Sequence, residues 1–253
     1  GKASPESVTR SLAAEHLVVA ERKGRRLATT RSVLEEETRM LAFARSGRGT
    51  CRPLGVPGYA LKREWLNADQ RRAVRHVLDS NDQVILVRGA AGTGKTTMMK
   101  EAVEGIEAGG KRVFVFAPSA DASRGVLRDV EGFADADTVA RLLVDERLQA
   151  QVAKQVIWID EAGLLGSRMM GRVFDLADRL GARVILSGDR RQHGSVERGA
   201  ALRLLEEEAG LFPAEIQEIQ RQRGDYKEAV RAFSEGRTED GFRELDRLGW
   251  IRE

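Results

Sequence analysis

The chain has 253 residues, and its 42 Lys and Arg against 39 Asp and Glu give a formal net charge of +3. This length predicts one or two domains, and 42% hydrophobic with 32% charged residues is typical of a globular protein with a buried core. No apolar run approaches the roughly 18 residues of a membrane span, and residues 1–10 lack the apolar core of a signal peptide. The single cysteine, Cys51, excludes a disulfide framework and a Cys-based zinc cluster, so a reducing, cytoplasmic location is the simplest expectation.

Positive charge is concentrated near the beginning of the chain. Residues 1–66 hold 13 basic and 7 acidic side chains, whereas residues 67–253 hold 29 and 32. Most of the basic residues are arginine, whose guanidinium group suits phosphate contacts. A nucleic-acid partner and a coding bias toward arginine explain this composition equally well.

Residues 1–60 are expected to form a basic, helical region and a linker. Apolar residues recur near helical spacing over 4–20, which predicts a first helix, and a basic turn containing a glycine follows at 22–26. A second helix is predicted over 31–45, beginning with a Ser-Val-Leu-Glu capping box at 32–35. Glycine and proline are frequent over 46–60, which indicates a linker and the best candidate domain boundary.

From residue 67 the pattern alternates between helices and short apolar strands. Helices are predicted over 67–79, 96–108, from about 119, and over 167–180, and strands over 83–88, 112–117, 155–159 and 183–187. The strands are apolar along most of their length, as in a parallel sheet covered on both faces. The chain is therefore expected to have an α/β fold with helices on both faces of a parallel sheet.

The segment Gly89–Thr96, GAAGTGKT, matches a phosphate-binding loop at every fixed position, and it lies between a predicted strand and a predicted helix. Its glycines allow backbone N–H groups to surround phosphates at a helix N-terminus. Lys95 would reach the β- and γ-phosphates, and the Thr96 hydroxyl would bind Mg²⁺. An ordinary glycine-rich turn is the disfavoured alternative. The expected ATP-binding residues here are Gly89, Gly92, Thr93, Gly94, Lys95, Thr96 and Thr97.

Two further strands end in polar residues. Val156–Ile159 is followed by Asp160 and Glu161, and active residues of such sheets gather at the carboxyl ends of strands. Asp160 would hold Mg²⁺ through water, and Glu161 would act as general base on the attacking water. Asp189 and Gln192 follow the strand at 183–187 and could sense the γ-phosphate or the attacking water, although this motif by itself is a weak signal and a polar loop is the alternative.

Gln70 has two possible roles. In Asn67-Ala68-Asp69-Gln70 it occupies the third helical position of an N-terminal cap. Its amide also offers a donor and an acceptor in one plane, which suits adenine. The local sequence favours the cap and leaves adenine recognition open.

Seven segments occur in the order of superfamily 1 helicase motifs. They are LNADQ (66–70), GAAGTGKTT (89–97), FAPSADAS (116–123), DADTVARLL (135–143), WIDEA (158–162), GDRRQ (188–192) and EIQRQ (218–222). The set resembles the RecD-like motor of large conjugative relaxases of the TraI/TrwC (MobF) type. Residues 28–49 also resemble the segment that precedes that motor, so the resemblance covers most of the chain.

The resemblance assigns roles residue by residue. It implies that Gln70 reads adenine, which overrides the preference for the cap, that Asp189 and Gln192 couple nucleotide to DNA, and that Arg221 contacts the γ-phosphate from a second RecA-like domain. The residues implied in binding single-stranded DNA are Pro118, Ser119, Thr138 and Arg141, and His193 is a further candidate, although an exposed loop histidine is the commoner case. Independently of the resemblance, the basic segment at 22–26 is expected to help through Arg25 and Arg26. Trp158 lies within an apolar strand, so we interpret it as a core residue.

The resemblance also predicts the domain organisation. Residues 1–60 are expected to form the N-terminal region, 61–212 the first RecA-like domain, and 213–253 the start of an incomplete second one, because such a domain needs on the order of 100 residues. The three histidines and two tyrosines are too scattered for the nicking chemistry of a relaxase. The chain is therefore expected to be a fragment whose partners include single-stranded DNA and the remaining domains of a larger relaxase-helicase.

Three functions remain open at this point. The leading hypothesis is an ATP-dependent translocase that moves 5′→3′ on single-stranded DNA, with the polarity implied by the family. The second is a module that binds nucleotide and DNA with little turnover because half of the motor is missing. The third, a P-loop enzyme such as a small-molecule kinase, leaves GDRRQ and the Arg-Gln pair at 221–222 unexplained.

Overall fold

The computed structural model describes residues 17–22, 24–89, 93–189, 200–217, 229, 232–233 and 237–250, without the side chains of residues 22 and 25–27. Four of the predicted site residues lie outside these ranges, namely Gly92, Gln192, His193 and Arg221. Within the described ranges, no helix is long and apolar enough to cross a membrane.

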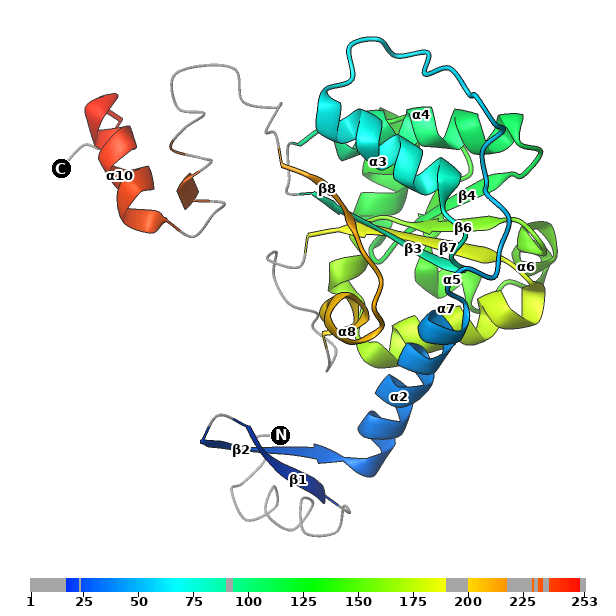
Figure 1. Ribbon diagram of the computed structural model, residues 1–253, viewed down its shortest axis with the longest axis horizontal. Coiled ribbons are helices and arrows are strands. Elements are labelled where there is room, and N and C mark those ends of the chain that lie inside the picture. Colours follow the sequence, from blue (N-terminus) through cyan, green and yellow to red (C-terminus); the bar gives the residue numbers. More distant parts are fainter. Residues whose placement is uncertain are drawn as a thin grey trace.

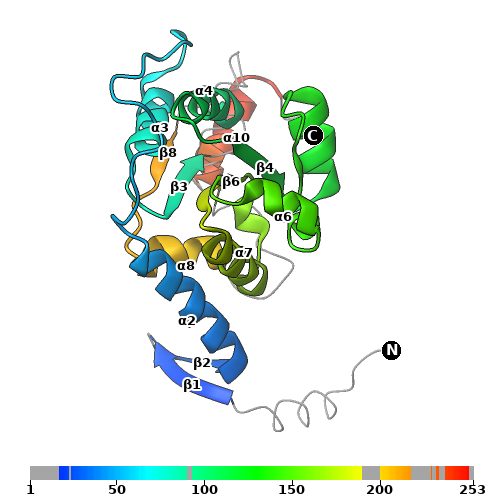
Figure 2. The same ribbon diagram turned by 90° about the vertical axis from the view of Figure 1, so that its right-hand side faces the viewer.

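The described chain begins with a β-hairpin. β1 (Leu17–Arg22) pairs antiparallel with β2 (Arg25–Thr30), and Gly24 makes the turn with a φ of 72°. Figures 1 and 2 show this hairpin beyond one end of α2, on the far side of α2 from the sheet. The turn expected at 22–26 is confirmed, but the helix expected over 4–20 is wrong at 17–20. The run Leu17-Val18-Val19 favours a strand, and a hairpin partner is available directly after the turn.

α2 (Arg31–Ser46) follows the hairpin and begins differently from the prediction. The Thr30 side chain caps it, accepting a hydrogen bond from the N–H of Val33 at 3.3 Å. The capping box expected at 32–35 is therefore wrong, because the helix has already begun at Arg31 and Thr30 takes the capping position.

Six strands of the described chain form one parallel sheet. In chain order they are β3 (Val84–Gly89), β4 (Val113–Ala117), β5 (Asp137–Thr138), β6 (Val156–Ile159), β7 (Arg183–Gly188) and β8 (Ala214–Ile216), and their spatial order is β5-β4-β6-β7-β3-β8. The predicted α/β fold is confirmed, and the four predicted strands match to within about one residue. The short edge strands β5 and β8 were not predicted.

Helices cover both faces of the sheet. The helices that follow α2 in the described chain are α3 (Ala68–Asp79), α4 (Lys95–Ala108), the π-helix η1 (Asp121–Val130), α5 (Val139–Leu142), α6 (Glu146–Val152), the 3₁₀-helix η2 (Ala162–Leu164), α7 (Ser167–Leu180), α8 (Ala201–Glu208) and α10 (Thr238–Arg247), the last of which stands apart from the sheet in Figure 1. Figure 1 shows α3 and α4 on one face and α2, α7 and α8 on the other. The helix predicted from about residue 119 begins at Asp121 and is a π-helix, a form often found at functional sites.

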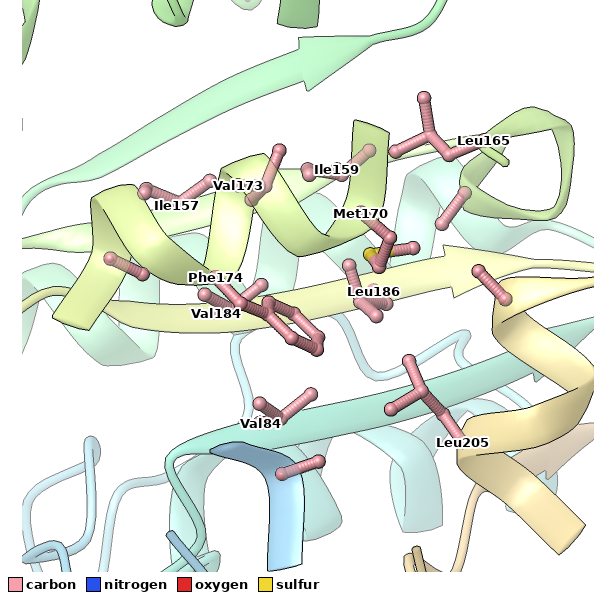
Figure 3. Close-up of a cluster of buried hydrophobic side chains, with 14 of the residues drawn as sticks. Val84, Ile157, Ile159, Leu165, Met170, Val173, Phe174, Val184, Leu186 and Leu205 are labelled. Atoms are coloured by element: carbon pink, nitrogen blue, oxygen red, sulfur yellow. The ribbon is translucent and has the colours of Figure 1, made fainter. Parts of the chain in front are cut away.

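The core consists of two layers, one on each face of the sheet. Side chains alternate along a strand, so Val84 and Leu86 of β3 pack in one layer and Ile85 and Val87 in the other. Figure 3 shows part of the first layer, where Phe174 of α7 meets β3 and β7. Burial of each such side chain contributes about 1.5–3 kcal/mol, which fixes the sheet as a rigid support for the loops at its ends.

The expected linker at 46–60 is a loop that packs against the domain. Leu54 and Tyr59 are buried in the layer formed with α3 and α4. Just beyond it, the fully buried Glu101 accepts hydrogen bonds from the N–H groups of Lys62 and Arg63 and from the Arg63 guanidinium at 2.8 Å. The segment therefore forms part of the α3–α4 face.

β8 extends the sheet past the boundary expected at residue 212. Its residues 214–216 pair with β3, and Arg88 of β3 forms ion pairs with Glu215 at 2.6 Å and with Glu206 of α8. The sheet therefore continues at least to Ile216, whereas the division into two domains stays a prediction. β8 was missed because a three-residue strand carries too short a local signal.

Candidate active site

The carboxyl ends of β3, β6 and β7 form one edge of the sheet, because the three strands run parallel. β7 lies between the other two, so the ends of β3 and β6 are two strand spacings apart, or roughly 10 Å. The glycine-rich loop follows β3, Asp160 and Glu161 follow β6, and Asp189 follows β7. The fold therefore brings the predicted phosphate-binding and acidic residues to one edge.

The glycine-rich loop enters α4 through a left-handed glycine. Gly94 has a φ of 77°, and within the described residues no side chain caps the helix. A Cβ atom on Gly89 would lie 2.8 Å from Oγ1 of Thr93 and 3.0 Å from Cγ of Lys95, so the loop folds closely over the end of β3. Both features match a loop that presents backbone N–H groups to an anion.

Lys95 folds back over this loop. Its Nζ donates a hydrogen bond to the carbonyl oxygen of Gly89 at 2.6 Å. A phosphate would replace this neutral acceptor with charged oxygens, which form stronger hydrogen bonds. Thr96 and Thr97 follow in the first turn of α4, and both are partly exposed.

The acidic pair is held by the end of β6. The N–H of Asp160 donates to the carbonyl oxygen of Phe116 at 2.8 Å, so the strand ladder reaches Asp160 itself. Glu161 then turns the chain with a φ of 52°, a left-handed conformation that is uncommon for residues other than glycine. Strain of this kind is found at sites where the direction of a side chain matters more than stability.

The surroundings of Glu161 raise its pKa. Burial is the largest cause, and the nearby carboxylate of Asp160 acts in the same direction, whereas the charge of Lys95 opposes them. A carboxylate with a raised pKa is a stronger base, which suits a group that accepts a proton from water.

Asp160 has a neighbour that the sequence reasoning missed. The Ser187 hydroxyl lies 2.7 Å from Oδ1 of Asp160, and the indole Nε1 of Trp158 donates to the same hydroxyl at 2.9 Å. Trp158 is fully buried, as expected of a core residue, but it also takes part in this polar chain. The sequence spacing could have indicated this contact. Trp158 and Asp160 are two residues apart in an extended segment, so their side chains lie on the same face of the sheet.

Asp189 lies beside the turn that follows β6. A Cβ atom on Gly163 would lie 2.9 Å from the Asp189 carbonyl oxygen, and one on Gly188 would lie 3.2 Å from the backbone nitrogen of Ala162. The backbones that follow β6 and β7 therefore touch. The proposed role of Asp189 in sensing nucleotide stays a prediction.

Gln70 makes the capping box and also contacts the glycine-rich loop. Its backbone N–H donates to Asn67 Oδ1 at 2.8 Å, and its Oε1 accepts from the Asn67 N–H at 3.0 Å. Its Nε2 donates to the carbonyl oxygens of Thr93 and Gly94 at 3.3 and 3.2 Å. With the side chain 1% exposed, adenine recognition by Gln70 stays a prediction that requires this amide to change partners.

Four of the residues predicted to bind DNA lie farther along the same edge of the sheet, at the carboxyl ends of β4 and β5. Pro118 and Ser119 follow β4, whereas Thr138 ends β5 and precedes Arg141, and the two strands pair through Ala117 and Thr138. The Ser119 and Thr138 hydroxyls accept hydrogen bonds from the N–H groups three residues later, as helix caps do. Arg25 and Arg26 lie in β2, away from this edge.

Three arginines surround one buried carboxylate at this edge. Asp137, which is 2% exposed, pairs with Arg141 at 2.5 Å, Arg124 at 3.2 Å and Arg128 at 3.4 Å. Burial acts to raise the pKa of Asp137, but the Thr138 N–H and these guanidinium groups hold it below its ordinary value. Arg124 and Arg128, which come from η1, were not among the predicted site residues. We name these three arginines the Asp137 arginine cluster.

A family model described as an AAA domain matches residues 65–253, which is most of the chain. The chain belongs to the AAA domain family. The matched region includes the whole parallel sheet and every loop of the site described above.

Curated relatives of this AAA domain include proteins of conjugation. It is 32% identical to the conjugal transfer protein TraA of Rhizobium radiobacter over 226 residues, which is 85% of this chain and 20% of that protein. It is 30% identical to the multifunctional conjugation protein TraI of Escherichia coli K12 over 224 residues, or 84% of this chain and 12% of that protein. These relatives confirm the resemblance, and this chain spans a fifth or less of their length.

Two further likenesses concern the motor fold. The AAA domain is 32% identical over 181 residues to the RecBCD enzyme subunit RecD of Mycobacterium tuberculosis, covering 60% of this chain and 31% of that protein. A solved structure of Pif1 helicases on forked double-stranded DNA superposes with a TM-score of 0.54 at 19% identity, over 74% of this chain and 52% of that one. The second likeness confirms the fold.

The donor groups of the AAA domain fit a magnesium ion shared with a nucleotide. Within the described ranges, no cluster of three or more His, Cys, Asp or Glu residues could hold a metal by itself. Two suitable donor groups lie at the carboxyl ends of the strands: the hydroxyl of Thr96, at the start of α4, and the carboxylate of Asp160, directly after β6. Mg²⁺ typically takes one or two protein ligands and completes its shell with phosphates and water, so this sparse set suits it.

The raised pKa of Glu161 predicts a dependence of stability on pH. A raised pKa means that the ionised carboxylate of Glu161 destabilises the folded state. The contribution of Glu161 to the free energy of unfolding is therefore most favourable below the pKa of an unfolded glutamate, about 4.3, and is lost as the pH rises through the pKa of Glu161 in the folded protein. Glu161→Gln should therefore melt at a higher temperature than the unaltered domain at pH 7.5, by roughly 2–4 °C for each kcal/mol of destabilisation that the substitution removes. The gain should shrink toward pH 4.5 in calorimetric scans. Glu107→Gln, at an exposed position of α4, is the control and should show no such gain.

Proposed function

We propose that this AAA domain is the ATP-binding and ATP-hydrolysing part of a helicase motor that moves on single-stranded DNA within a conjugative relaxase-helicase. One observation carries the proposal: the phosphate loop and the acidic pair lie at the same edge of the sheet, with only the end of β7 between them, and this edge continues into the Asp137 arginine cluster. The names of the TraA, TraI and RecD relatives support it. The 5′→3′ polarity follows from the family resemblance.

The residues at the nucleotide edge would divide the chemistry as follows. Lys95 and the N–H groups of the loop bind the β- and γ-phosphates, and Thr96 and Asp160 hold Mg²⁺. The bound ion neutralises charge on the phosphates. Glu161 takes a proton from the attacking water, and its raised pKa makes it a stronger base than an ordinary glutamate.

The DNA strand would cross the carboxyl ends of β4 and β5. Arg124, Arg128 and Arg141 are one-third to one-half exposed, so their guanidinium groups can reach phosphates while they stay near Asp137. Asp137, together with Asp145, which pairs with Arg141 at 3.2 Å, offsets two of the three arginine charges, so the cluster keeps one net positive charge. Contacts of this type fix the backbone and carry no sequence information, which suits a motor.

The test is the salt dependence of binding to a labelled oligothymidylate, measured by fluorescence anisotropy with and without an ATP analogue. Affinity should fall steeply with salt, because each single-strand phosphate neutralised adds about 0.7 to the slope of log K against log salt. Arg124→Gln with Arg128→Gln should flatten that slope by up to about 1.4.

The control for this test is Arg112→Gln. Arg112 precedes β4, at the opposite end of that strand from the cluster, and its side chain is exposed and pairs with Asp135. It should leave the slope unchanged. An affinity that does not vary with salt would contradict the proposed DNA path, and ATPase turnover distinguishes a motor from a module that only binds.

A further inference from the structure

We propose that Ser187 is a positioning residue for Asp160, and that Trp158 fixes the direction of the Ser187 hydroxyl. The inference rests on the proposed function, in which Asp160 holds the Mg²⁺ of a bound nucleotide. It is carried by the polar chain from Trp158 Nε1 through Ser187 Oγ to Asp160 Oδ1, with distances of 2.9 and 2.7 Å.

The register of two strands places these groups together. β6 and β7 pair in parallel with Ile159 opposite Leu186, so the next residues along, Asp160 and Ser187, are also neighbours. Trp158 lies two residues before Asp160 and therefore on the same face of the sheet. The arrangement therefore follows from the register of the two strands.

The chemistry of the groups fixes the direction of each hydrogen bond. An indole N–H can only donate, so Ser187 must accept from Trp158. The single proton of the Ser187 hydroxyl is then available for one strong bond, and the Asp160 carboxylate at 2.7 Å is closer than the Ile159 carbonyl oxygen at 3.4 Å. The carboxylate is also the stronger acceptor because it is charged.

Burial makes this chain rigid. Trp158 is 0% exposed and Ser187 is 1% exposed, so water does not compete for either group. Oδ1 of Asp160 is held by Ser187, and the carboxylate is thereby turned in one direction before any nucleotide arrives. A group that orients a metal-holding carboxylate typically changes metal affinity by about 10- to 100-fold when it is removed.

The experiment measures the Mg²⁺ concentration that half-saturates binding of a fluorescent, non-hydrolysable ATP analogue to the full chain. Ser187→Ala should raise that concentration by about 10-fold or more, and should leave the weaker binding measured in EDTA unchanged. Ser187→Thr keeps the hydroxyl and should restore most of the Mg²⁺ response. Trp158→Phe removes only the orienting donor, so we expect a shift in the same direction and of smaller size.

A second readout is the emission of Trp158 at saturating Mg²⁺ and analogue, so a change in affinity alone does not alter it. Trp65 and Trp250 are 72% and 68% exposed, so replacing both with phenylalanine leaves Trp158 as the only indole. Its emission should change when Mg²⁺ and the analogue bind together, and Ser187→Ala should abolish that change. If Ser187 only stabilised the fold, Ser187→Ala would lower the free energy of unfolding but leave the emission change of Trp158 intact. Ser167→Ala, which removes another 1% exposed hydroxyl on α7, is the matched control and should move neither readout.

The outcomes separate this inference from the proposed function. If Asp160→Asn raises the Mg²⁺ requirement but neither Ser187→Ala nor Trp158→Phe does, the positioning role is wrong and the nucleotide site stands. If the unaltered chain binds no nucleotide, or if Asp160→Asn leaves the Mg²⁺ requirement unchanged, Asp160 does not hold the Mg²⁺ of a bound nucleotide. The positioning role of Ser187 is then wrong as well.

Discussion

Lys95→Ala is expected to weaken binding of Mg²⁺-ATP by about 10²- to 10⁴-fold. Lys95 stands at the start of α4 with its Nζ on the Gly89 carbonyl oxygen, so it is placed to transfer to phosphate oxygens. Hydrogen bonds between charged groups contribute about 1.5–3 kcal/mol each, and two of them account for this range. Isothermal titration calorimetry with the ATP analogue measures it directly.

Lys100→Ala is the matched control for that change. Lys100 lies on the same helix and carries the same charge, but it pairs with Glu131 at 2.9 Å. Its removal should leave the nucleotide affinity within about twofold, since surface ion pairs contribute little. Equal affinities for Lys95→Ala and the unaltered chain would show that the loop does not bind phosphate.

Glu161→Gln is expected to slow ATP hydrolysis by about 10²- to 10⁴-fold, the range for loss of a general base. The substitution keeps the size of the side chain and its left-handed backbone position, but removes the group that accepts the proton. Nucleotide binding should be retained or slightly strengthened, because a carboxylate near the phosphates is lost. Phosphate release at saturating ATP, with single-stranded DNA present, measures the rate.

Two comparisons make this second result specific. Asp160→Asn should instead raise the Mg²⁺ requirement, which distinguishes a metal-holding carboxylate from a base. Glu107→Gln should leave the rate unchanged. Hydrolysis by Glu161→Gln at the unaltered rate would assign the base to another residue, and loss of its binding would point to a structural role.

The inner strands were predictable because their signal is local. Buried parallel strands are continuous apolar runs, so β3, β4, β6 and β7 stand out from the sequence, and the glycine-rich loop is recognised by spacing alone. The edge strands β5 and β8 have two and three residues, and only their pairing with β4 and β3 defines them. Most of strand β1 was mistaken for the end of a helix, because a few apolar residues fit both the helical and the strand spacing.

Contacts between distant segments limited the prediction of the site. The Asp137 arginine cluster forms because η1 packs over β5, which a linear pattern does not reveal. The link from Ser187 to Asp160 likewise requires β6 and β7 to be neighbours in a known register. For Gln70 the local reasoning found the capping box, whereas its hydrogen bonds to the Thr93 and Gly94 carbonyl oxygens depend on how α3 lies against the loop.

The pairing of β8 with β3 has a mechanical consequence. Parallel strands share evenly spaced hydrogen bonds, so tension applied to the chain beyond Gln217 along the strand axis loads these bonds in shear, together rather than one by one. Arg88 adds an ion pair with Glu215 across the same junction, and the Gln217 N–H donates a hydrogen bond to Asp69 at 3.0 Å. Tension on the chain beyond Gln217 is therefore transmitted through β8 to β3, the strand that leads into the glycine-rich loop. A displacement of that loop is transmitted in the opposite direction, from β3 through β8.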